Sequence, residues 1–151
     1  MNFKKLVKPY FKSEMQSLGE LVSINSIYDE STVSGKTPYG KGVDDALNYM
    51  ADLGKLYGFD VDMCDGRGVE LSYGDNGPLI SIFAHLDVVP VSNDWKHPPF
   101  ALSYDDKEKM LYGRGVADDK GPAIAAFYAV KALKDNDLLN NVRIKLFFGG
   151  D

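Results

Sequence analysis

The stretch LISIFAHLDVVP, residues Leu79–Pro90, decides the fold that we expect for this chain of 151 residues. Its first six residues are apolar except for Ser81 and favour β structure, which is typical of a strand buried on both faces. His85 and Asp87 follow this predicted strand directly. Because open α/β sheets bind ligands at the carboxyl ends of their strands, His85 and Asp87 are candidate site residues.

Apolar residues at helical spacing predict two helices before this stretch, over residues 9–24 and 43–57. The segment between them, residues 27–41, is rich in Ser, Thr, Gly and Pro and predicts an exposed loop. Gly58 stands at a position where the end of a helix favours glycine. Short strands are predicted over residues 59–63 and 69–73.

The turn before the central stretch contains Asn76-Gly77, which predicts a hairpin into the strand that follows. After that strand comes a long irregular segment rich in proline, residues 88–100, and then a short predicted strand over residues 110–112. The glycine-rich segment GRGVADDKG leads into Pro122, which suits the first turn of a helix. An Ala-rich helix is predicted over residues 123–133.

This order of elements predicts an α/β fold with a mixed, mainly parallel sheet flanked by helices. A further buried strand is predicted over residues 142–148, and the connection to it from the strand before His85 is long enough for a right-handed parallel crossover. In that arrangement His85, the loop that carries Asp118, and Asp151 all lie at one edge of the sheet. We therefore expect them to converge on one crevice.

The bulk composition excludes several classes of partner. The net charge of −5 argues against nucleic acid and against an anionic membrane surface, since both favour basic patches. No apolar run reaches the roughly 18 residues of a membrane-spanning helix, and the start of the chain lacks the apolar region of a signal peptide. The single cysteine, Cys64, fits a reducing compartment, so we expect a cytoplasmic protein.

Each candidate residue also has an ordinary structural interpretation. His85 could be a satisfied core histidine, Asp87 could cap a turn, and Asp118 or Asp119 could cap the helix that follows. Taken together these interpretations are weaker, because adjacent carboxylates repel one another at a buried sheet edge unless a cation is present. A histidine with a carboxylate two residues on, facing further carboxylates, favours a metal ligand with its orienting aspartate.

Other chemistries fit the sequence less well. There is no G-x-S-x-G elbow for a serine hydrolase and no H-E-x-x-H zinc motif. Cys64 lies among aspartates, a poor setting for a thiolate nucleophile. The segment that begins Gly113-Arg114-Gly115 departs from a dinucleotide-binding fingerprint, since its sixth position is the negatively charged Asp118.

The motifs HLDVVP, W-x-x-x-P-F ending at Phe100, GRGVADDKGP and FFGGD together resemble the zinc-dependent aminoacylase and carboxypeptidase superfamily. Within it the chain is most similar to the PepV-type bacterial dipeptidases, a likeness that extends to residues 39–59. The resemblance implies the catalytic domain of a di-zinc exopeptidase, a hydrolase with two zinc ions in each intact site.

The resemblance also implies a role for each matching residue. His85 corresponds to a terminal ligand of one zinc, and Asp118 to the carboxylate that bridges two zincs. Asp87 corresponds to the catalytic carboxylate that orients the histidine, and the peptide from Asp118 to Asp119 is cis in such proteins. Arg114 and Lys120 match the motif and are assigned structural roles.

The implied reaction is metal-dependent hydrolysis of the amide bond of dipeptides by a zinc-activated water, with a glutamate beyond the FFGGD strand as general base. We expect residues 1–151 to be the N-terminal part of the catalytic domain, inactive without the remainder and the lid domain. Two alternatives stay open: a deacylase of small N-acyl amino acids in the same superfamily, and a non-catalytic remnant used for binding. The oligomeric state is not predicted.

Overall fold

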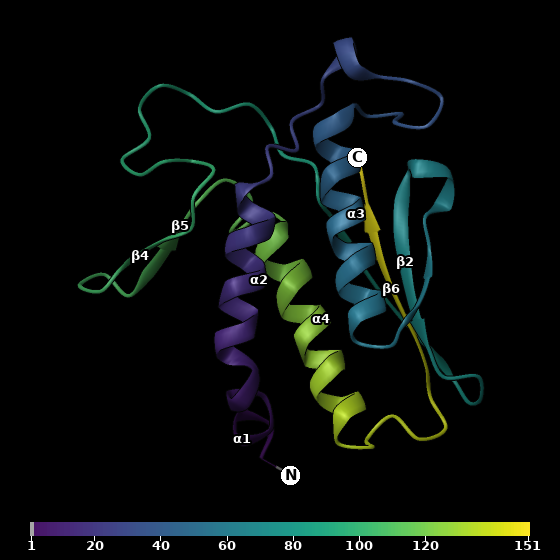
Figure 1. The fold of residues 1–151 in the computed structure, drawn as a ribbon. Helices are drawn as coiled ribbons and strands as arrows, with labels where there is room; N and C mark the ends of the chain where they lie inside the picture. The colour runs from purple at the N-terminus through teal and green to yellow at the C-terminus, as the bar shows by residue number, and fades with distance from the viewer. Residues whose placement is uncertain (1) are drawn as a thin grey trace.

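The computed structural model describes residues 2–151 as a layer of helices against a sheet (Figure 1). The four α-helices are α1 (Phe3–Val7), α2 (Phe11–Ser23), α3 (Lys41–Leu56) and α4 (Lys120–Asp135). The six strands are β1 (Asp60–Asp62), β2 (Gly68–Tyr73), β3 (Leu79–His85), β4 (Ser103–Asp105), β5 (Met110–Tyr112) and β6 (Arg143–Gly149). None of the helices within residues 2–151 is long and apolar enough to cross a membrane.

The main sheet has the strand order β1-β2-β6-β3. β3 and β6 are parallel neighbours, and the chain passes between them through α4, as the predicted crossover requires. β2 pairs with β6 and with β1 in antiparallel fashion. The predicted α/β fold with a mixed sheet is confirmed, but the expectation that the sheet is mainly parallel is wrong, because only the β3–β6 pairing is parallel.

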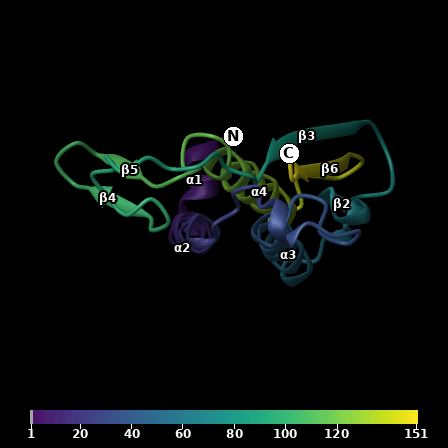
Figure 2. The same cartoon turned by 90° about the horizontal axis from the view of Figure 1, so that it is seen from above.

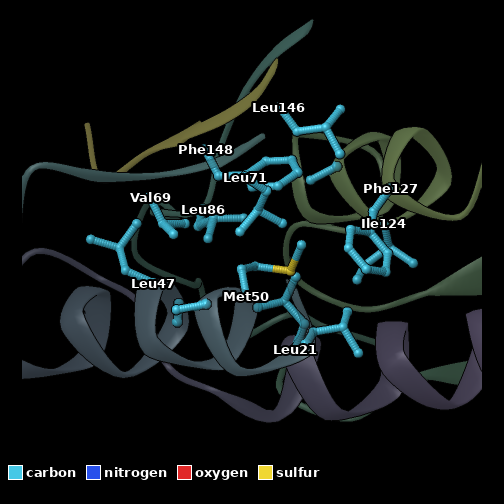
Figure 3. Close-up of a cluster of buried hydrophobic side chains, with 14 of the residues drawn as sticks. Leu21, Leu47, Met50, Val69, Leu71, Leu86, Ile124, Phe127, Leu146 and Phe148 are labelled. Atoms are coloured by element: carbon cyan, nitrogen blue, oxygen red, sulfur yellow. The ribbon is translucent and has the colours of Figure 1, made fainter. Parts of the chain in front are cut away.

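The helices pack on one face of this sheet, where alternate strand residues are buried (Figure 2). In β6 the buried residues Ile144, Leu146 and Phe148 alternate with more exposed ones, as a strand with one covered face requires. α3 lies against β1 and β2, and α4 lies against β3 and β6. The core between the layers holds the labelled side chains Leu21, Leu47, Met50, Val69, Leu71, Leu86, Ile124, Phe127, Leu146 and Phe148 (Figure 3).

The prediction that β3 is buried on both faces is wrong. β3 is an edge strand, and the side chain of Phe83 on its open face is 73% exposed. Phe83 packs against the neighbouring Phe147, with ring centroids 5.9 Å apart. An apolar run indicates that a strand could be buried on both faces, but it does not show that both faces are covered. Here the helices of residues 2–151 cover only the face of β3 opposite to Phe83.

The predicted hairpin at Asn76-Gly77 is also wrong, since β6 lies between β2 and β3. The local turn chemistry is nevertheless used: Gly77 has φ +85°, and an added Cβ would lie 1.8 Å from the carbonyl oxygen of Asn141. The Arg143 amide donates to the Pro78 carbonyl at 2.9 Å, so the turn pairs with the start of β6. The residues of a turn determine local backbone angles, but they do not determine which strand pairs with the one that follows.

The remaining differences are small. The strand β4 was not predicted; it pairs with β5 in a separate two-stranded sheet that extends away from the helices (Figure 2). The short helix α1 was not predicted either. The predicted helices, the loop over residues 27–41 and the strand after α4 are confirmed with shifts of a few residues at their ends.

The core predicts how this chain responds to truncation of its side chains. Leu146→Ala removes a fully buried side chain between the sheet and α4, so we expect a loss of about 2–5 kcal/mol in the free energy of unfolding. Leu79→Ala is the matched control, because 46% of Leu79 is exposed, and we expect it to cost less than about 1 kcal/mol. Urea denaturation measures both, and equal losses would contradict the one-sided core.

Candidate metal centre

The end of β3 sets the direction of two candidate side chains. His85 is the last residue of the strand, and the Leu86 amide extends the ladder by donating to the Gly149 carbonyl at 2.9 Å. The Leu86 side chain is fully buried in the core. Because successive residues of extended chain point to opposite sides, His85 and Asp87 project together, away from the core.

The structure brings the three predicted site residues together. His85 Nδ1 lies 3.0 Å from Asp87 Oδ1, and His85 Nε2 lies 3.1 Å from Asp118 Oδ1. The imidazole is thus held between two carboxylates, one from its own segment and one from the loop before α4. The Asp118 side chain is 87% exposed, so it borders open space at the sheet edge. The metal-ligand and orienting roles of these residues stay predictions.

The charges of this cluster favour a cation. Burial lowers the pKa of His85, but the hydrogen bond to Asp118 and the charge of Asp87 outweigh it. The pKa of His85 therefore lies above its usual value. The two carboxylates thus favour positive charge at the imidazole between them.

Both aspartates of the loop before α4, Asp118 and Asp119, contact His85. The peptide bond between Asp118 and Asp119 is cis, as the sequence resemblance implied. Asp119 stands at the N-cap position of α4, yet its side chain makes no capping hydrogen bond. Instead its carboxylate accepts from the backbone amide of His85 at 3.3 Å. The capping interpretation of Asp119 is therefore replaced by a direct link between the loop and β3.

A pocket of about 210 Å³ lies beside the cluster, and its lining includes His85, Asp87, Asp118, Trp95 and Arg114. The Arg114 guanidinium lies over the Trp95 ring at 4.9 Å and donates to the Pro90 carbonyl at 3.1 Å. This contact packs Trp95 against Arg114, and the structural role of Arg114 stays a prediction. The irregular segment over residues 88–100 thereby forms one wall of the pocket.

Two other side chains do not join the cluster. His97 stacks on Tyr112 with ring centroids 4.5 Å apart. Asp151 follows β6 at the same sheet edge, is exposed, and makes no hydrogen bond to the cluster within the described part of the chain. Across residues 2–151, no group of three or more His, Cys, Asp and Glu side chains is arranged to hold a metal ion.

Lys120 is the residue whose environment the sequence did not reveal. It is the largest fully buried side chain among the described residues, and burial lowers its pKa to about 8, against the opposing charge of Asp87. A lysine beside glycine in a loop motif gives no sign that its ammonium is enclosed, so this burial could be found only from the structure.

These features define a class of protein: an α/β fold with a histidine held between two carboxylates at the carboxyl edge of the sheet. A comparison of sequences then shows which family part of this chain is similar to. Residues 82–151 match the family described as Peptidase family M20/M25/M40, which confirms the resemblance found in the motifs.

Individual relatives agree with this family. The chain is 32% identical over 149 residues to the Beta-Ala-Xaa dipeptidase of Lactobacillus delbrueckii subsp. lactis, covering 99% of this chain and 32% of that protein. The structure of the di-peptidase Dug1p from Saccharomyces cerevisiae superposes with a TM-score of 0.82 at 21% identity, covering 98% of this chain and 34% of that chain. The likeness to Dug1p shows the fold.

A third comparison concerns a metal-dependent relative. The M20 family metallo-carboxypeptidase Sso-CP2 from Sulfolobus solfataricus matches with a TM-score of 0.72 at 28% identity, covering 91% of this chain and 30% of that chain. The chain spans about a third of the length of the curated relatives that it matches.

The electrostatics of the cluster yield a prediction for the metal-free chain. Asp118→Asn removes one of the two charges that favour the imidazolium, so we expect the pKa of His85 to fall, as measured by NMR titration of its ring protons. Because the folded-state pKa is raised, the cluster stabilises the fold at low pH and this contribution is lost as pH rises through that pKa. Asp106→Asn, in the exposed turn between β4 and β5, is the control; an unchanged pKa in Asp118→Asn would contradict the contact.

Proposed function

We propose that the whole protein is a zinc-dependent dipeptidase and that residues 1–151 are the N-terminal part of its catalytic domain. The observation that carries this proposal is the placement of His85 between Asp87 and Asp118 at the carboxyl edge of the sheet. The match of residues 82–151 to a peptidase family supports it. The single cysteine supports a cytoplasmic location as part of the same proposal.

The donor set of the cluster fits zinc. Imidazole nitrogen and carboxylate oxygen are both ordinary zinc ligands, and by their usual bond lengths two ligands of one tetrahedral zinc lie roughly 3.4 Å apart. His85 Nε2 and Asp118 Oδ1 are 3.1 Å apart, close to that spacing before any adjustment. Asp87 lies on Nδ1, so it holds the ring in the tautomer that leaves Nε2 free for a metal.

The residues of this chain then have defined tasks. A bound zinc pair would polarise the scissile carbonyl and lower the pKa of a water molecule toward about 7. His85 would bind metal through Nε2, and Asp118 through its exposed carboxylate. Asp87 would keep the imidazole oriented and raise its basicity. The pocket beside them, walled by Trp95 and Arg114, would admit the substrate next to the ligands.

The choice of dipeptides rests on the relatives. The Lactobacillus relative is named for the dipeptides that it acts on, and the yeast relative is described as a di-peptidase. The similarity to a metallo-carboxypeptidase supports the metal requirement. A deacylase of small N-acyl amino acids remains the alternative, and it differs in a way that an assay separates.

The proposal is tested on the whole protein with a β-alanyl dipeptide, an α-dipeptide, a tripeptide and an N-acetyl amino acid. We expect dipeptide hydrolysis that is lost with a chelator and restored by zinc. Asp118→Ala should lower kcat/KM by about 100-fold or more, since loss of a metal ligand removes the charge that stabilises the transition state. His97→Ala, which alters the histidine outside the cluster, should change it less than about threefold.

Two results would decide against this function. Preferential hydrolysis of the N-acetyl amino acid would support the deacylase. Hydrolysis that does not depend on zinc would show that the proposed metal site is not needed for the reaction. The same conclusion would follow if Asp118→Ala kept the activity of the unaltered protein.

A further inference from the structure

The buried ammonium of Lys120 binds the end of a helix from another part of the chain. Lys120 is the first residue of α4, two residues after Asp118. Its Nζ donates to the carbonyl of Leu21 at 3.0 Å and to that of Ile24 at 2.7 Å. These carbonyls lie at the C-terminus of α2, where the helix dipole favours a cation, and the Leu21 carbonyl also accepts from the Ile24 amide at 3.3 Å.

The segment that follows α2 is bound in turn to the backbone around Asp87. Ser26 is fully buried, and its Oγ donates to the Leu86 carbonyl at 2.6 Å. The Val88 amide donates back to the Ser26 carbonyl at 3.0 Å. Residues 21–26 are therefore hydrogen-bonded to both segments that supply the cluster: through Lys120 to the start of α4, and through Ser26 to the residues on either side of Asp87.

The glycine-rich loop packs onto the stem of the same lysine. Gly115 has φ +86°, and an added Cβ there would lie 3.0 Å from Lys120 Cδ and 3.1 Å from Val88 Cγ1. The Gly121 amide donates to the Gly115 carbonyl at 3.1 Å, which closes the loop that contains Asp118. The stem of Lys120 therefore supports this loop from inside, while its ammonium fixes the loop to α2.

We propose that Lys120 is a positioning residue for the metal centre, which, together with Ser26, sets the separation between His85 and Asp118 through residues 21–26. The inference rests on the proposed function only in calling the cluster a metal centre. The two ligand-bearing segments are 33 residues apart in sequence. The contact between His85 Nε2 and Asp118 joins the two proposed ligands, so metal binding would rearrange it. Lys120 is not a proposed ligand, so its contacts with the end of α2 stay in place when a metal binds.

The test compares two lysines of α4 in the whole protein. Lys120→Met keeps most of the stem and removes the ammonium. Lys131→Met is the matched control, since Lys131 is also buried but pairs with Asp135 and lies 4.3 Å from the ring centre of Tyr57, on a later turn of the helix. The measurements are zinc affinity by chelator competition and the separation of His85 Nε2 from Asp118 in crystals of the metal-free variants.

We expect Lys120→Met to weaken zinc binding by about 10–100-fold, as loss of a supporting group around a metal typically does, and to lengthen the separation of His85 from Asp118. Lys131→Met should change neither, although both variants lose thermal stability. In the dipeptide assay Lys120→Met should lower kcat with little change in KM.

Ser26→Ala provides a second variant if Lys120→Met does not fold. It removes the buried hydroxyl from the other side of the same connection, with Ser23→Ala, whose exposed hydroxyl donates to Glu20, as its control. We expect weaker zinc binding in Ser26→Ala alone.

Unchanged separation and unchanged zinc affinity in Lys120→Met, or in Ser26→Ala where Lys120→Met does not fold, would overturn the positioning role, even if the protein hydrolyses dipeptides. Conversely, a lengthened separation in the metal-free variant would support it even if the protein hydrolyses none.

Discussion

The parallel pairing of β3 with β6 is the interaction on which the site depends. It brings His85 opposite Gly149, and the ladder continues one step to the Leu86 amide. Because the Leu86 side chain is buried in the core, the side chains on either side of it, those of His85 and Asp87, both point away from the core. The imidazole–carboxylate pair is therefore a consequence of strand register and core packing.

The crossover between those strands supplies the other half of the site. α4 must begin beside the end of β3 in order to run back along the sheet, and the loop before it brings Asp118 to the far nitrogen of the imidazole. Two carboxylates on opposite sides of one ring raise the pKa of His85 and make the site receptive to a cation. The buried ammonium of Lys120 next to this cluster is satisfied by helix carbonyls, those of Leu21 and Ile24.

The sequence predicted the parts of this arrangement that short motifs encode. His85, Asp87 and Asp118 were chosen as candidates because they lie in short motifs at the predicted carboxyl edge of the sheet. The burial of β3 on both faces and its hairpin with β2 were wrongly predicted, because Phe83 and Gly77 reflect local preferences while neighbours distant in sequence decide exposure and register. The contacts of Lys120 span about a hundred residues, and no local pattern carries such information.

The central claim is that His85 and Asp118 together hold zinc, with Asp87 behind the imidazole. Anomalous diffraction at the zinc absorption edge, from crystals of the whole protein grown with zinc, tests this directly. The account predicts an anomalous peak within bonding distance of His85 Nε2 and of the Asp118 carboxylate, with Asp87 still on Nδ1. Zinc bound elsewhere, with the His85–Asp118 contact left intact, would contradict it.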